Sequence, residues 1–109
     1  MFLAAGYNST SSDVDIHDCV ISGIDQKSSS GIKIIGSDNK ISNCHIQGFR
    51  RGMDIDAGGI YCHNIHTLHH GTFDDDYPND SVGFLVRSGF HEFHHCYADT
   101  HASGWVFKS

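Results

Sequence analysis

The sequence contains few of the residues that favour helices. Its 109 residues include a single Glu and three Leu, whereas Ile and Val together number 16. Because β-branched side chains favour strands, this composition predicts an almost entirely β chain. Proline occurs once and the 12 glycines follow no three-residue period, which excludes a collagen-like fold. No run of 18 apolar residues is present, so we expect no insertion into a membrane.

Basic residues are scarce as well. Seven Lys and Arg stand against 13 Asp and Glu, which gives a formal net charge of −6. A chain this acidic is poorly suited to the phosphate backbone of nucleic acids, so we expect no nucleic-acid partner. A hydrophobic content of 39% excludes a disordered tail, and the length suffices for one domain, residues 1–109, with a modest core.

A repeat organises the chain. Gly31, Gly52, Gly83 and Gly104 each precede a triplet whose first and third residues are apolar, and a weaker copy begins at Gly6. A second block of four residues follows each triplet. Its last residue lies 13 residues after Gly31 and after Gly83, and we place it 12 residues after Gly52. The connection to the next glycine varies from 8 to 19 residues, which is typical of a solenoid with variable loops on one face. The second blocks are Ile16-His17-Asp18-Cys19, Ile41-Ser42-Asn43-Cys44, Tyr61-Cys62-His63-Asn64 and Phe93-His94-His95-Cys96.

This period predicts an all-β fold, a right-handed parallel β-helix with about four coils of about 21 residues. The first and third residues of each triplet should point inward and the middle residue outward, because side chains alternate along a strand. Strands that carry apolar residues up to both ends of the segment indicate a fragment of a longer β-helix. Parallel strands are expected, stacked in order, at residues 32–34, 53–55, 84–86 and 105–107.

The third residue of each second block is expected to form a sharp turn. It is Asp18, Asn43, His63 or His95. Asn, Asp and His are the non-glycine residues that most readily adopt a positive φ. A left-handed residue at this place in every coil would separate the second strand from the third.

The last residue of each block predicts a stack of small buried side chains. Cys19, Cys44 and Cys96 share this place, with Asn64 in the third coil, and Cys62 has no partner in register. We expect reduced thiols. A disulfide between Cys19 and Cys44 is the alternative, since neighbouring strands bring their Cα atoms to about 4.8 Å.

Two stretches carry a family resemblance. Residues 31–46, which read GIKIIGSDNKISNCHI, resemble a coil of the pectin-lyase-like β-helix superfamily, and Cys96-Tyr97-Ala98-Asp99 followed by Gly104-Trp105-Val106-Phe107 resembles coils of bacteriophage tailspikes. The resemblance implies binding and cleavage of a bacterial surface polysaccharide, with glycoside hydrolysis favoured. It also implies a homotrimer of the full-length protein and a place in the virion tail or outside the cell.

Asp54 and Asp56 are the candidate catalytic residues. Alternation places both on the outer side of one strand, where we expect them to face solvent, with Cα atoms about 6.5–7 Å apart. Inverting glycoside hydrolases hold their two carboxyl groups about 6.5–9.5 Å apart. The alternative is a ladder of ion pairs, with Asp54 beside Lys33 and Asp56 beside Arg87, which would add little stability.

The variable connections supply candidate substrate-binding residues. Arg50 and Arg51 precede Gly52, and the longest connection combines acidic and aromatic residues, which suit sugar hydroxyls and sugar rings. A solvated acidic loop, or one that holds calcium, is the alternative. The histidine clusters are explained by the turn, so no metal and no cofactor is expected. The candidates for substrate binding are Lys33, Arg50, Arg51, His70, Asp74, Asp75, Asp76, Tyr77 and Arg87.

Two other functions remain open. A non-catalytic β-helix would act as a shaft or a receptor-binding module. A polysaccharide lyase or epimerase would need a base and a cation near a uronate, and Arg50, Arg51 and Lys33 are candidates for the cation.

Overall fold

The computed structural model describes residues 2–3, 7–68, 81–99, 101 and 103–108. Within these residues every regular element is a strand, as the Ile and Val content predicts. The same residues contain no helix that could cross a membrane. The strands are β1 (Phe2–Leu3), β2 (Tyr7–Ser9), β3 (Asp15–His17), β4 (Val20–Ile34), β5 (Asn39–Leu68), β6 (Val82–His94), β7 (Tyr97–Asp99) and β8 (Ser103–Phe107).

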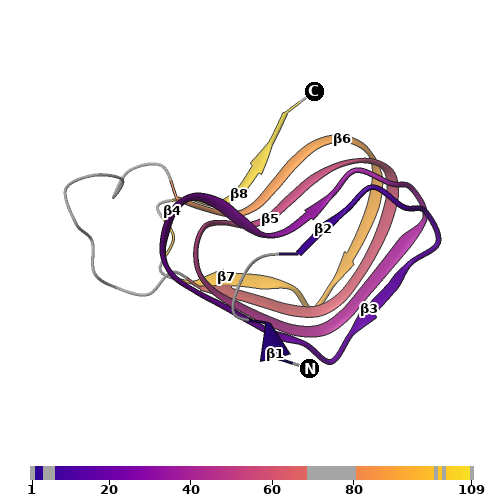
Figure 1. Ribbon diagram of the computed structural model, residues 1–109. Helices are drawn as coiled ribbons and strands as arrows, with labels where there is room; N and C mark the ends of the chain where they lie inside the picture. Colours follow the sequence, from indigo (N-terminus) through magenta and orange to yellow (C-terminus); the bar gives the residue numbers. More distant parts are fainter. Residues whose placement is uncertain (1, 4–6, 69–80, 100, 102, 109) are drawn as a thin grey trace.

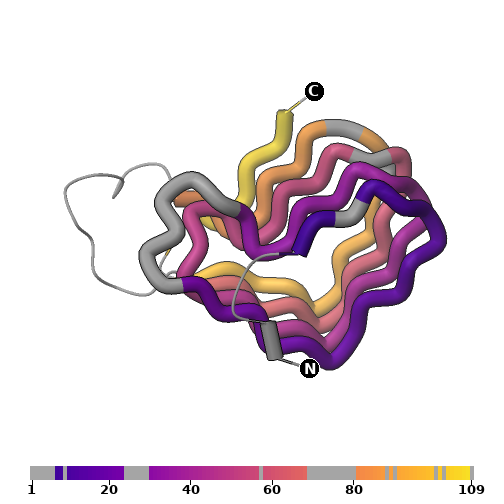
Figure 2. Tube along the Cα trace, in the orientation of Figure 1, coloured from indigo at the N-terminus to yellow at the C-terminus, as the bar shows by residue number. Residues whose placement is uncertain are grey.

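All the strands belong to one parallel sheet. The order along its main path is β1-β4-β5-β6-β8, while β2 pairs with β4, and β3 and β7 pair with β5. The sheet does not close into a barrel. The long strands β4, β5 and β6 bend around corners, so that successive passes of the chain follow similar paths one above the other (Figures 1 and 2).

The register follows the glycine spacing. Met53 pairs with Ile32 on one side and with Phe84 on the other, and Phe84 pairs with Trp105. The offsets of 21, 31 and 21 residues equal those between the repeated glycines. The four strands predicted for this face, and their order, are therefore confirmed.

The inner residues of these strands form the core. Ile32, Met53 and Phe84 are completely buried, as predicted. Trp105 is only partly buried, and Phe107 is 68% exposed. Both belong to β8, the last strand on the main path of the sheet, which has β6 on one side only among the described strands.

The turn residue of the third block is Asn64, not His63. Asp18, Asn43 and His95 have φ values of 55°, 53° and 54°, as predicted, and in the third block Asn64 has a φ of 58°. The second block therefore begins one residue later than the sequence alignment placed it, at Cys62. With this correction the third block ends at Ile65, which is 13 residues after Gly52, and the other blocks also end 13 residues after their glycines.

The stack predicted for the last residue of each block, which we call the thiol column, has a different third member as a result. Ile65 takes the place predicted for Asn64, while Cys62 pairs with Phe93 and is fully buried. All four cysteines are free, and Cys19 and Cys44 are buried, but Cys96 is only half-buried. The thiols of Cys19, Cys44 and Cys96 each donate to the carbonyl oxygen two residues earlier, over 3.3, 3.3 and 3.4 Å. Burial raises the pKa of Cys44 to about 11 and that of Cys62 still further.

Candidate functional site

Asp54 lies on the outer side of β5, but it does not face solvent. Its register neighbours are Lys33 and Leu85, as the ladder predicts, yet Asp54 is only 2% exposed and Leu85 4%. Arg87 of β6 binds the Asp54 carboxylate in a bidentate manner, with Nε donating to Oδ1 at 2.8 Å and Nη2 to Oδ2 at 3.1 Å. The prediction of a solvent-facing Asp54 is therefore wrong, because alternation gives the side of the sheet but not what covers that side.

Asp56 is exposed and does not pair with Arg87 in register. The ladder shifts after Ile55, and Asp56 pairs with Ser88 instead, because β6 contains one more residue than β5 at this point. The guanidinium of Arg87 thus bonds Asp54 and not Asp56, and this bond is the main cause of the raised pKa of Arg87. The charge of Asp56 raises it further.

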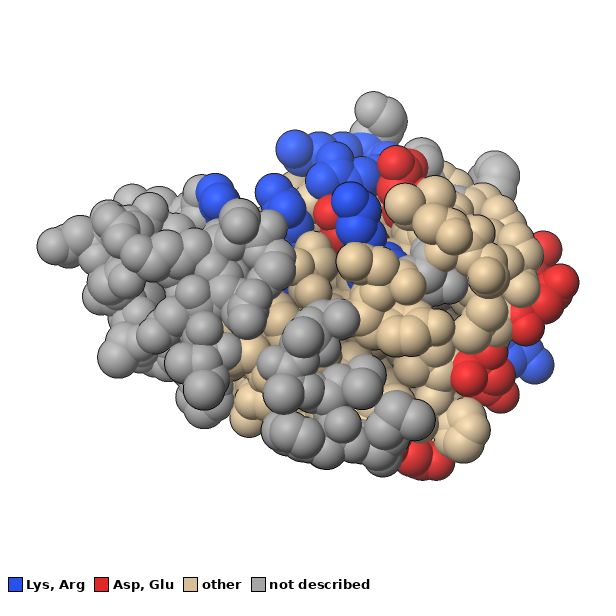
Figure 3. Space-filling model, in the orientation of Figure 1, with Lys and Arg blue, Asp and Glu red and all other residues tan. Residues whose placement is uncertain are grey.

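These residues form what we call the charged face: Lys33, Asp54, Asp56, Arg87 and Lys108. Lys33, Asp56 and Lys108 are exposed, and Arg87 is 37% exposed. The backbone N–H of Lys108 donates to the carbonyl oxygen of Val86 at 2.8 Å, so Lys108 lies beside Arg87. Figure 3 shows Lys and Arg side chains gathered on one part of the surface, with a few carboxylates among them.

The remaining predicted residues are placed as follows. Arg50 and Arg51 lie on β5 directly before Gly52 and are half-buried, and Arg51 pairs with Ser30 and Val82. The other substrate-binding candidates, which are His70, Asp74, Asp75, Asp76 and Tyr77, lie outside the described residues.

A second surface escaped the sequence reasoning. His45 and His66 follow the thiol column on β5, and Tyr97 begins β7. The rings of His66 and Tyr97 are stacked at 4.0 Å, and His45 meets His66 edge-on at 4.8 Å. A shallow depression of about 480 Å³ lies between these rings and the turn residues Asn43 and Asn64. We call it the ring groove.

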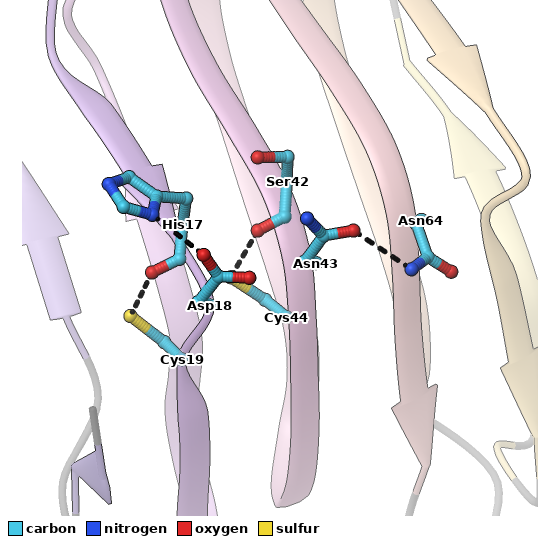
Figure 4. A network of polar contacts seen from close by, with 7 residues as sticks. All are labelled: His17, Asp18, Cys19, Ser42, Asn43, Cys44 and Asn64. Carbon is cyan, nitrogen blue, oxygen red and sulfur yellow. Dashed lines mark hydrogen bonds and ion pairs between the residues drawn. The ribbon is translucent and has the colours of Figure 1, made fainter.

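The opposite wall of the ring groove is a ladder of turn side chains (Figure 4). Asn64 Nδ2 donates to Asn43 Oδ1 at 2.9 Å. His17 Nδ1 and Asp18 Oδ2 lie 2.9 Å apart. The bond to His17 is the main cause that lowers the pKa of Asp18, to which a hydrogen bond from Asn43 contributes, and the bond to Asp18 raises the pKa of His17.

A signal for the ring groove was present in the sequence. Val20, His45 and Tyr97 each follow a cysteine of the column directly. The fourth member, His66, was hidden by the one-residue error in the third block, which placed Ile65 there instead. The spacing of the histidines alone does not distinguish the position after the thiol column from the other positions that carry histidine.

Several histidines of the described segments contact rings or carboxylates. No three His, Cys, Asp or Glu side chains in these segments are arranged to hold a metal ion. His63 meets His95 edge-on at 5.7 Å, and His94 lies 3.4 Å from the Glu92 carboxylate.

Comparison with protein-family models, with curated proteins and with solved structures finds no match for this chain.

Proposed function

We propose that the described strands are coils of a right-handed parallel β-helix of the pectin-lyase-like type, and that the chain binds a bacterial surface polysaccharide. The parallel pairing of the four glycine triplets, in their order along the chain, supports the fold, since a solenoid repeats one strand arrangement at each pass. In this proposal the chain belongs to a homotrimeric tailspike-like protein at the virion tail or outside the cell.

The Asp54–Arg87 pair carries the proposal of polysaccharide binding. A buried ion pair contributes little net stability, because desolvation of the charges offsets their attraction. Here the pair fixes the orientation of Arg87, whose side chain remains 37% exposed. Arg carries five N–H donors, and the two bonds to Asp54 leave others to bind hydroxyl or carboxylate oxygens. Lys33 and Lys108 extend this donor surface.

Hydrolysis is the reaction we favour, with Asp56 as the carboxylate that reaches the glycosidic bond. Asp54 has both oxygens bound to Arg87, so it takes part only if the guanidinium moves. This locked carboxylate favours one alternative, a non-catalytic receptor-binding or shaft module. A lyase or epimerase, with Lys33 beside a uronate, is the other.

A panel of capsular and O-antigen polysaccharides tests the proposal. We expect the wild-type chain to bind at least one of them and Lys33→Ala to bind it more weakly. Lys40 is an exposed lysine near the start of β5, so Lys40→Ala serves as the control and should bind like the wild type. New reducing ends that disappear in Asp56→Asn would support hydrolysis. An unsaturated product that absorbs in the ultraviolet would indicate a lyase, and binding without product a non-catalytic module. Retention of no polysaccharide would refute the proposed function.

A further inference from the structure

Three histidines lie together where β6 ends. His63 of β5 pairs in register with His94 of β6, and His95 is the turn residue of positive φ that follows directly. The rings of His63 and His95 meet edge-on, with their centroids 5.7 Å apart. Neighbouring strands are separated by about 4.8 Å, so His94 lies one strand spacing from His63. We call His63, His94 and His95 the histidine cluster.

The rings of the histidine cluster are accessible and have nitrogens available for a ligand. His94 and His95 are exposed, and His63 is half-buried. His94 Nε2 lies 3.4 Å from the Glu92 carboxylate, whose side chain is 70% exposed. Among the described residues, the ring nitrogens of His63 and His95 form no hydrogen bond or ion pair. When protonated, each of these two rings can therefore offer two N–H donors to a ligand.

The first of the second blocks shows how a carboxylate balances a histidine at this place. His17 and Asp18 occupy the positions there that His94 and His95 occupy in the last block. His17 Nδ1 lies 2.9 Å from Asp18 Oδ2, and this bond is the main cause of the raised pKa of His17. In the last block a second imidazole, His95, takes the place of the carboxylate. Protonated rings at this turn therefore meet another imidazole and not a carboxylate of the turn.

Few charges oppose protonation products in the histidine cluster. Glu92 is the one carboxylate among the titratable groups at the adjoining strand positions. Histidine side chains become protonated below about pH 6.5, so the histidine cluster gains up to three positive charges beside this single carboxylate. The titratable groups at the adjoining positions are Lys40, Tyr61, His66, Glu92, Cys96 and Tyr97.

Positive charges this close repel one another, so protonation of the whole cluster is unfavourable without a counterion. An anion bound among the rings removes the repulsion, and by linkage proton uptake and anion binding favour each other. A metal ion needs ligand nitrogens about 2.0–2.1 Å from a single point, an arrangement that the described residues do not provide. A tetrahedral oxyanion is less demanding, because each of its oxygens can accept an N–H at about 2.7–3.2 Å.

From these observations we propose that the histidine cluster is a second binding site, separate from the charged face, that takes up phosphate or sulfate together with protons below about pH 6.5. It requires no binding at the charged face, so the two proposals can fail independently.

NMR of the imidazole C–H signals between about pH 8 and about pH 5 tests the site. The titration is run in sodium sulfate and in sodium chloride of equal ionic strength. We expect the titration midpoints of His63, His94 and His95 to lie about 0.5 pH unit higher in sulfate, which is about a threefold gain in proton affinity. His17 and His45 report the effect of sulfate outside the histidine cluster in the same spectra and should move by less than half as much.

The chain itself suggests the substitutions. His95→Asn keeps the turn, because Asn43 and Asn64 adopt the same positive φ, and it should at least halve the effect of sulfate at His63. His17→Ser is the matched control, because Ser42 is the register partner of His17 on the next pass of the chain. We expect this variant to leave the effect of sulfate on the histidine cluster unchanged.

Dextran sulfate distinguishes the source of the anion, with uncharged dextran as its control. Higher midpoints in free sulfate would support a site for the free anion, and higher midpoints with dextran sulfate alone would support a site for sulfate esters on a polymer. Equal midpoints under all these conditions would overturn the proposal. Equal displacement at His17 and His45, or an equal effect of uncharged dextran, would overturn it as well.

Discussion

Replacing Gly52 by alanine tests the packing of the strands at one corner of the sheet. An ideal Cβ at Gly52 would lie 2.5 Å from the carbonyl oxygen of Gly83 and 2.6 Å from both Cβ and Cγ2 of Thr67. Thr67 is completely buried and the oxygen belongs to the backbone of β6, so neither can move without a change in the spacing of the strands. Overpacking of this kind costs about 1–3 kcal/mol, and three rigid contacts place Gly52→Ala near the upper end.

Gly104→Ala is the matched control from the same column of glycines. There the new Cβ would meet only Cβ of Ala98 at 3.7 Å, which is ordinary van der Waals contact. We expect this variant to lie within about 0.5 kcal/mol of the wild type. A loss of about 3 kcal/mol in Gly52→Ala corresponds to a fall in Tm of about 12–24 °C for a domain of this size.

Urea and thermal unfolding, followed by circular dichroism and by the fluorescence of Trp105, measure both variants. We expect a large difference in stability between the two variants although the substitution is identical. A Gly52→Ala protein with the unfolding midpoint of the wild type would refute it, as would equal destabilisation by Gly104→Ala.

Three further predictions concern the turn ladder and the thiols. Asn43 has a φ of 53°, so Asn43→Ala should be about 1 kcal/mol less stable in urea than Asn43→Gly, which keeps the left-handed conformation. The stabilisation from the lowered pKa of Asp18 is present above the ordinary value of 3.8 and is lost as pH falls, whereas that from the raised pKa of His17 is present below 6.5 and is lost as pH rises. In Asp18→Asn an NMR titration should show a lower pKa for His17 than in the wild type, still raised by the charge of Asp15. Burial raises the pKa of Cys44 to about 11 and that of Cys62 further, so both thiols should resist iodoacetamide at pH 8 in the folded protein. All four cysteines should react in denaturant. Rapid labelling of Cys44 or Cys62 in the folded protein would contradict their burial.

The sequence predicts the strands of the glycine triplets residue by residue, but it predicts the second blocks with an error. Glycine spacing is a strong marker of register because the close contacts at Gly31 and Gly52 exclude every side chain larger than hydrogen. Cysteine is a weaker marker. In the third coil the place of Cys44 is taken by Ile65, not by a cysteine, and assigning Asn64 to it shifted the third block by one residue. That single error also hid His66 and with it the ring groove.

The burial of Asp54 could not be predicted in the same way. Alternation along a strand determines on which side of the sheet a residue lies, but the cover over that side depends on which neighbour reaches across. Here the neighbour is Arg87, two residues further along β6 than Leu85, the register partner of Asp54. A diagonal contact of this kind follows from the local course of the backbone, which the pattern of apolar residues does not encode.

The register shift after Ile55 connects these observations. The pairing is regular from Met53 to Ile55, and the first irregularity comes between Ile55 and Asp56, where β6 contains an additional residue. A bulge bends its strand and changes the direction of the side chains around it, and bulges are frequent beside functional sites. With regular pairing Arg87 would lie opposite Asp56. The bulge places Ser88 there instead, so the guanidinium binds Asp54 and the Asp56 carboxylate remains exposed on the charged face. The irregularity thus separates two carboxylates of one strand into a locked, buried group and an accessible one, which is the difference on which the proposed role of Asp56 depends.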